Sequence, residues 1–163
     1  MKRIFCVLFI LTYLISAISS CKKQENYTDE ISTSTLSARV QTALAESDVS
    51  VFAEDSYLDA YFTRPDFVTE QTILYSENGN NLNEIGIFHT TDGYAKKLEK
   101  LLNRYLSASL AQNQAYYNSY IPEETPKLQH AEVRSFGNYV TYAILNEHDR
   151  NVFFATIEKE LKK

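Results

Sequence analysis

The chain has 163 residues and a formal net charge of −5, and a length in this range suits one domain with its own hydrophobic core. Beyond the N-terminal segment, basic residues adjoin only in pairs, at Lys22-Lys23, Lys96-Lys97 and Lys162-Lys163, and no longer basic block occurs. Nucleic-acid binding requires a clustered positive face, so the composition excludes a nucleic-acid partner. Both cysteines, Cys6 and Cys21, occur in the first 21 residues. We therefore expect neither a disulfide nor a thiolate metal site in the folded domain.

The N-terminal segment has the pattern of a secretory signal peptide. Lys2 and Arg3 form a short positive start, and residues 4–18 form an uncharged, mainly apolar run. Small residues, Ser19 and Ser20, then precede Cys21. A membrane-spanning helix needs roughly 20 apolar residues, so this run favours a cleaved signal over a permanent span. We predict that residues 1–20 are removed.

Cys21 is the expected lipidation site. The small residues before it resemble the lipobox that bacterial lipoprotein signal peptidase cuts, and this resemblance implies a diacylglycerol group on the Cys21 sulfur. Two acyl chains anchor a protein stably, whereas one holds it only marginally. The alternative is an ordinary secreted protein with an incidental cysteine. We expect a protein anchored in the cell membrane through Cys21, on the extracytoplasmic face.

Residues 21–34 are expected to form the lipidated cysteine and a polar tether. They are rich in Ser, Thr and charged residues, and after Cys21 only Tyr27 and Ile31 are apolar. A single globular domain is then expected over residues 35–163.

The domain is expected to begin with helices. Apolar residues recur at helical spacing from Leu36 to Leu44, and Ser34 or Thr35 is placed to cap that helix. Residues 56–62 predict a second short helix. Pro65 favours one more helical turn over residues 65–70.

A hairpin and the longest helix are expected next. Residues 71–76 and 84–90 predict two antiparallel strands, because the Gly- and Asn-rich segment between them has loop chemistry. Asp92 is placed to cap a helix over residues 93–118, where leucine and tyrosine repeat at three- and four-residue steps. Pro122 ends this helix, because a residue before proline avoids the helical region.

The C-terminal part predicts a second hairpin and a last helix. Residues 123–129 predict a brief helical turn. Residues 133–136 and 139–145 predict strands joined by a two-residue Gly-Asn turn. Residues 147–163 predict an amphipathic helix. The order α-α-β-β-α-β-β-α indicates an α+β domain, in which an antiparallel sheet built from two hairpins packs against helices.

Several short stretches resemble one family of small bacterial lipoproteins. They are residues 84–88 (EIGIF), Asp92-Gly93, residues 120–123 (YIPE) and residues 137–140 (GNYV), in this order. The family is known as domain of unknown function 4358, common in Gram-positive gut and clostridial-type bacteria, and the likeness covers about residues 49–163. The resemblance implies lipid anchoring and a small α+β domain. It implies no activity and no catalytic residues.

No catalytic motif stands out in the sequence. His89, His130 and His148 have no metal-ligand spacing, and Gly-rich phosphate loops and nucleophile elbows are missing. Close acidic groups occur in three places, and we interpret them as helix-start and solvation charges: Glu54-Asp55, Glu123-Glu124 and Glu147-Asp149. We therefore expect no catalytic residues, no metal site and no cofactor.

Tyr116, Tyr117 and Tyr120 form the candidate binding surface. They lie where the long helix is expected to end, and tyrosine combines a flat apolar face with a polar tip that favours interfaces and sugar stacking. The alternative is that Tyr120 fills the core while Tyr116 or Tyr117 covers its rim.

The expected role is a non-enzymatic binding or interaction module at the cell surface, with an envelope protein or a glycan as partner. The alternative is a small cell-envelope hydrolase with dispersed Glu, Asp or His residues. A deep pocket with a pKa-perturbed carboxylate or histidine would favour the hydrolase, and a flat aromatic face would favour the binding module. A third alternative is a partner role in solute capture for a transporter.

Overall fold

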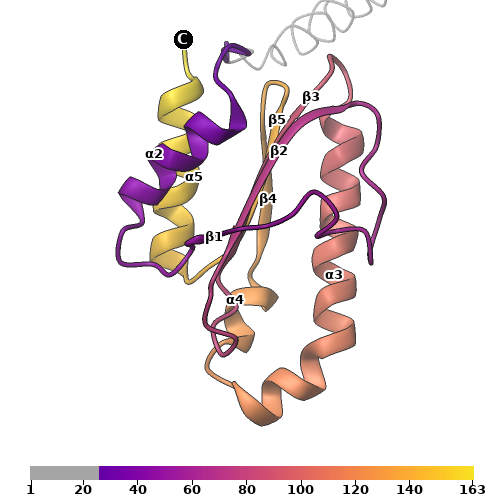
Figure 1. Cartoon of the computed structure of the whole chain (residues 1–163), viewed down its shortest axis with the longest axis vertical. Coiled ribbons are helices and arrows are strands. Elements are labelled where there is room, and N and C mark those ends of the chain that lie inside the picture. Colours follow the sequence, from indigo (N-terminus) through magenta and orange to yellow (C-terminus); the bar gives the residue numbers. More distant parts are fainter. Residues whose placement is uncertain (1–25) are drawn as a thin grey trace, which may run out of the picture.

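The computed structural model describes residues 26–163, which form one antiparallel sheet with helices on both faces (Figure 1). The five strands lie in the order β1-β2-β3-β5-β4. The predicted signal peptide, 1–20, and the predicted lipidation site, Cys21, lie outside the described residues. Within the described residues, no helix combines the length and the apolar character needed to cross a bilayer.

The sheet joins two hairpins side by side, as the sequence predicts. The first pairs β2 (Val68–Tyr75) with β3 (Glu84–Thr90), and the second pairs β4 (Glu132–Phe136) with β5 (Tyr139–Ile144). Antiparallel pairing of β3 with β5 connects the hairpins. The sequence analysis missed the two-residue edge strand β1 (Val51–Phe52), which pairs with β2.

Two hydrophobic cores lie on opposite faces of the sheet. Helices α2 (Thr33–Ala43) and α5 (Glu147–Leu161) cover one face (Figure 1). The other face is covered by α3 (Ala95–Tyr120) and α4 (Thr125–Gln129). Strand β5, which lies between β3 and β4, is buried along its whole length, because helices cover both faces of the sheet. The α+β architecture of the sequence analysis is therefore confirmed, with helices on both sides of the sheet.

Alternation along β3 sends its residues to different cores. Ile85 and Ile87 belong to the core under α2 and α5, whereas Phe88 belongs to the core under α3. Successive side chains of a strand point to opposite faces. Glu84 and Gly86 therefore share the α3 face with Phe88, and this places a carboxylate at the edge of a hydrophobic core.

Two local predictions in the first half of the domain were wrong. Residues 56–62 form successive turns without a helix, and β2 extends back to Val68 in place of the predicted turn at 65–70. Pairing with β3 explains the longer strand, because Val68 lies opposite Thr90 after an irregularity in the register. A strand partner distant in sequence overrode the local preference that Pro65 suggested.

The predicted caps of two helices were also wrong. Ser32 caps α2 by accepting a hydrogen bond from the Thr35 backbone at 3.2 Å, so the cap lies before Ser34. Helix α3 starts after Tyr94, without a side-chain cap. Asp92 accepts a hydrogen bond from the Asn138 side chain at 2.5 Å, which ties the start of α3 to the β4–β5 turn.

The N-terminal segment packs against the domain, whereas we expected a tether up to residue 34. The Thr28 backbone N–H donates to the Leu161 carbonyl at 2.8 Å. The ring of Tyr27 meets that of Phe136 edge-on at 5.7 Å, and Ile31 packs against the core under α2 and α5. The two apolar residues of the polar segment thus hold it in place, and the described fold begins before the expected boundary.

Candidate functional site

Glu84, the first residue of β3, is a carboxylate buried in the core under α3. Only 7% of the residue is exposed. It lies opposite Tyr75 of β2 and Ile144 of β5, at one end of the sheet. A buried carboxylate is costly unless hydrogen bonds or opposite charges compensate for its lost hydration. Its partners therefore define the chemistry of this region.

Three tyrosine hydroxyls donate hydrogen bonds to the Glu84 carboxylate. Tyr105 of α3 and Tyr142 of β5 donate to Oε1 at 2.6 and 2.5 Å. Tyr57, from the irregular segment after β1, donates to Oε2 at 2.8 Å. The four residues come from different parts of the chain, and only tertiary packing brings them together. We call this group the Glu84–tyrosine cluster.

Gly86 makes room for one member of this cluster. It pairs with Tyr142 across β3 and β5. A Cβ added to Gly86 would lie 2.2 Å from Cε1 of Tyr142 and 2.8 Å from Cε2 of Phe88. The missing side chain thus lets the Tyr142 ring lie across β3 and reach Glu84.

Burial governs the protonation of the cluster. It raises the pKa of Glu84 above its usual value, and the hydrogen bonds from Tyr105, Tyr142 and Tyr57 offset only part of this effect. Burial, followed by the negative charge of Glu84, raises the pKa of each of these tyrosines. The hydroxyls therefore remain protonated donors, and the carboxylate retains a proton at higher pH than an exposed glutamate would.

A pocket of about 140 Å³ opens beside the cluster. Aromatic rings form much of its wall, contributed by Tyr57, Tyr75, Tyr105 and Tyr117. Polar side chains form another part of the lining, namely Ser76, Asn81, Asn83 and Ser109. Tyr57 and Tyr75 stack at 5.3 Å between ring centres. The pocket thus combines a buried acid with an aromatic and uncharged polar lining.

The charged residues next to this pocket already have polar or charged partners. Lys127 lies 2.7 Å from the Glu124 carboxylate and also donates to the Asn81 and Asn83 side chains at 3.1 and 2.9 Å. The Ser76 hydroxyl donates to Asp48, and this hydrogen bond is the main cause of the lowered pKa of Asp48. Glu84 forms no ion pair with any Lys, Arg or His of the described residues.

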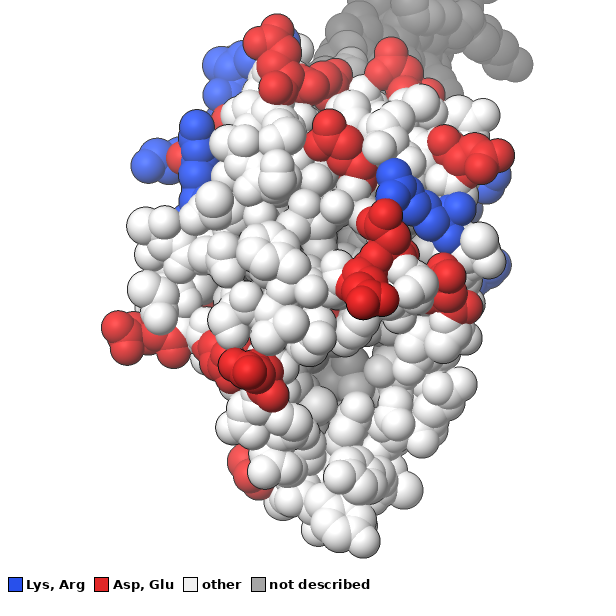
Figure 2. Space-filling model, in the orientation of Figure 1, with Lys and Arg blue, Asp and Glu red and all other residues white. Residues whose placement is uncertain are grey.

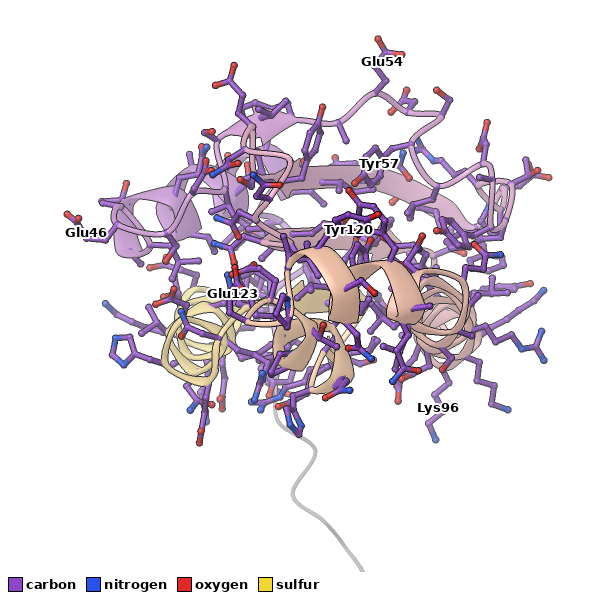
Figure 3. The ribbon with its side chains drawn as sticks, turned by 90° about the horizontal axis from the view of Figure 1, so that it is seen from below. Glu46, Glu54, Tyr57, Lys96, Tyr120 and Glu123 are labelled. Atoms are coloured by element: carbon purple, nitrogen blue, oxygen red, sulfur yellow. The ribbon has the colours of Figure 1, made fainter. Side chains whose placement is uncertain are left out.

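The predicted tyrosine surface adjoins this pocket through Tyr117. Tyr116 and Tyr120 are 57% and 71% exposed, so the alternative that Tyr120 fills the core is wrong. Their ring centres lie 4.8 Å apart, and the Tyr116 ring meets that of Tyr117 at 5.8 Å. Tyr117 also lines the pocket. The view from below shows Tyr120 at the end of α3, with Tyr57 nearby in projection (Figure 3).

The surface around the pocket carries little charge. The chain has no Asp, Glu, Lys or Arg between Arg104 and Glu123, a stretch that includes the whole second half of α3. Figure 2 shows this uncharged surface at the lower end of the molecule, beside a hollow. Charged side chains concentrate at the opposite end in this view. Contacts at the lower end therefore depend on aromatic and neutral polar groups.

The histidines and acidic pairs of the sequence analysis do not converge. Across residues 26–163, no group of three or more His, Cys, Asp and Glu side chains is arranged to hold a metal ion. His89 contacts the Thr69 hydroxyl at 2.8 Å, far along β3 from Glu84. Glu147 and Asp149 lie in the first turn of α5, where acidic groups stabilise the helix dipole.

Sequence reasoning missed Glu84 and its three hydroxyl donors as site residues. A carboxylate that opens an otherwise apolar strand was an available signal, because burial of such a group demands a partner. In the sequence analysis, Tyr105 falls within the leucine and tyrosine spacing of the predicted helix 93–118, and Tyr142 falls within the predicted strand 139–145, without a further role for either residue. Their convergence could not be inferred from spacing, because they lie 21 and 58 residues from Glu84.

Comparison with known proteins gives one match. The model of a family described as a domain of unknown function (DUF4358) matches residues 59–145, which is more than half of the chain. The match includes Glu84, Tyr105, Tyr117 and Tyr142, whereas Tyr57 precedes it. No curated protein and no solved structure matches the chain.

Proposed function

The chain belongs to the DUF4358 family, and from this premise we propose that it is a lipid-anchored extracytoplasmic binding module at the cell surface. The lipid on Cys21 is the membrane anchor in this proposal, and the domain acts by recognition without catalysis. Its binding end is the pocket beside Glu84, together with the exposed rings of Tyr116 and Tyr120. The partner is an envelope protein or a glycan.

The observation that carries this proposal is the uncharged tyrosine surface around the pocket. Exposed tyrosines supply large contact areas at low conformational cost, and their rings stack on sugars and on apolar side chains. This surface lies at the end of α3, whereas the start of the described chain lies at the opposite end of the domain (Figure 1). An anchor that precedes residue 26 would then leave the tyrosine surface facing away from the membrane.

The pocket also supports a second candidate, a small envelope hydrolase, because a buried carboxylate with a raised pKa can act as a general acid. Glycoside hydrolysis, however, uses two carboxyl groups that face each other at about 5 to 10 Å. Glu84 is the single carboxylate among the described residues that line this pocket, so the second carboxyl group is missing from this lining. The binding module is therefore the better supported function.

A double variant, Tyr116→Ala with Tyr120→Ala, tests the proposal. The full lipidated chain is purified from native membranes in mild detergent, and bound proteins and sugars are quantified by mass spectrometry. We expect the double variant to lose a stoichiometric partner that the unmodified chain retains. Its melting temperature should change little, because both rings are largely exposed.

Tyr94→Ala is the matched control, because Tyr94 is another exposed tyrosine, 43% accessible, at the opposite end of α3. It should retain the partner. Equal recovery of partner with the double variant and the unmodified chain would contradict the proposal. A large loss of stability without any loss of partner would indicate that the rings serve the fold.

A further inference from the structure

We propose that the pocket beside Glu84 binds a small organic ammonium group, with the Glu84 carboxylate as its counter-ion and tyrosine rings as its walls. This inference rests on the proposed binding function and narrows the ligand to a chemical class. Four features support it: the charge balance, the aromatic wall, the free acceptor capacity of Glu84 and the size of the pocket.

Once the Glu84 carboxyl is ionised, the charge around the pocket is negative, and no basic group of the described residues offsets it. Glu84 has no basic partner among residues 26–163, and Lys127 is neutralised by Glu124 at 2.7 Å. Asp48 adds a second negative charge behind Ser76, a residue of the pocket lining. An anionic ligand would meet repulsion here, whereas a cation would gain attraction that the partly dry surroundings strengthen.

The tyrosine rings provide the kind of wall that favours a cation. The face of an aromatic ring carries negative charge density, so an ammonium group close to it is attracted even without a hydrogen bond. Four tyrosines line the pocket: Tyr57, Tyr75, Tyr105 and Tyr117. Aromatic walls around a carboxylate therefore suit an ammonium group with apolar substituents.

Glu84 retains capacity for one more hydrogen bond. Oε1 accepts from Tyr105 and Tyr142, whereas Oε2 accepts from Tyr57 only. Each carboxylate oxygen has two acceptor sites. Tyr57 is also the most exposed of the three donors, with 37% of the residue accessible. An ammonium N–H can therefore donate to Oε2 on the side where the pocket reaches solvent.

The pocket size limits the ligand to a small group. A cavity volume of about 140 Å³ leaves room for only a few non-hydrogen atoms beside the carboxylate. Butylammonium, with five such atoms, matches this size, and its chain resembles the end of a lysine side chain.

Isothermal titration calorimetry on the full chain in detergent tests the proposal, with butylammonium chloride as the probe. Butan-1-ol is the matched neutral probe, and ionic strength is held constant. We expect saturable binding of butylammonium and binding of butan-1-ol at least about tenfold weaker, because only the ammonium group uses Glu84 as a counter-ion. Equal binding of the two probes would overturn the proposal.

Glu84→Gln should weaken butylammonium binding by about tenfold or more, since the amide keeps the shape and removes the charge. Glu46→Gln is the control for net charge, because it makes the same chemical change at an exposed residue far from the pocket (Figure 3). An equal loss in both variants would indicate a general surface effect and would overturn the proposal.

Ser109→Leu is a second test variant, which is used if Glu84→Gln does not fold. Ser109 lines the pocket from α3, so the larger side chain fills the cavity while the carboxylate remains. Butylammonium binding should disappear, and unchanged binding would overturn the proposal. If no probe binds but the partner of the Tyr116–Tyr120 surface is retained, the ammonium inference fails and the binding module stands.

Discussion

Gly86 and Tyr142 face each other across β3 and β5, and the lack of a side chain at Gly86 decides where the Tyr142 ring lies. The ring crosses the strand at this point and reaches the Glu84 carboxylate. A small residue in a strand often marks such a close approach. At the scale of single residues, the hydrogen bond from Tyr142 to the buried Glu84 carboxylate requires the space that Gly86 leaves.

Gly86→Ala should therefore destabilise the protein. The added Cβ would lie 2.2 Å from Cε1 of Tyr142, so the ring must move from a packed position and its hydrogen bond to Glu84 is strained. Overpacking in a core costs about 1 to 3 kcal/mol. Urea unfolding should show a loss of unfolding free energy in this range.

Gly79→Ala is the control for this experiment, because a Cβ at Gly79 meets no atom within 4 Å. It should leave the free energy of unfolding nearly unchanged. Equal stability of the Gly86→Ala variant and the unmodified chain would show that the Tyr142 ring is not held against β3.

At the scale of elements, helix ends depend on contacts that a linear pattern does not reveal. Helix α2 begins one turn earlier than its apolar pattern suggests, because Ser32 caps it and Thr33 docks onto β2. The Thr33 backbone N–H donates to Glu70 at 3.0 Å, and its hydroxyl lies 2.9 Å from that of Thr72. The first turn of α2 is thus secured by the sheet.

Ser32→Ala should lower the free energy of unfolding by about 1 kcal/mol, the usual cost of losing a serine N-cap. Its hydroxyl accepts from the Thr35 backbone N–H, which would lose this partner in the first turn. Thermal unfolding followed by circular dichroism measures the change. Ser34→Ala should have a smaller effect, and the reverse order would show that the cap lies at residue 34.

At the scale of the whole molecule, the two ends of the described chain lie together. Tyr27 pairs with Lys162 in an isolated bridge beside the end of α5. The uncharged tyrosine surface lies at the opposite end (Figure 1). In the proposed function, this arrangement separates the anchoring end of the domain from its binding end.

Cys21→Ser tests the anchor in that proposal. Without the thiol, no diacylglycerol can be attached, and the modified N-terminus cannot form. We expect unprocessed or released protein in place of a membrane-bound mature form. Membrane fractionation and intact mass measure both effects, and unchanged retention with an unchanged mass would contradict lipidation.

Periodic patterns in the sequence were sufficient for much of the fold. Strand β3 begins and ends where its composition predicts, and the Gly-Asn turn of the second hairpin was recognised because only two residues had to be interpreted. The leucine and tyrosine spacing predicted α3 to within two residues at each end. The strand, the turn and the helix each depend on residues that are close together in the sequence, so local patterns predict them well.

The candidate site depended on tertiary structure. The sequence by itself determined both hairpins and the helices that correspond to α2, α3, α4 and α5, and it indicated Tyr116, Tyr117 and Tyr120 as a candidate surface, because periodicity and side-chain chemistry are local properties. Only the tertiary structure placed the hydroxyls of Tyr57, Tyr105 and Tyr142 around Glu84. These groups lie 21 to 58 residues from Glu84, and packing of the sheet against α3 brings them together.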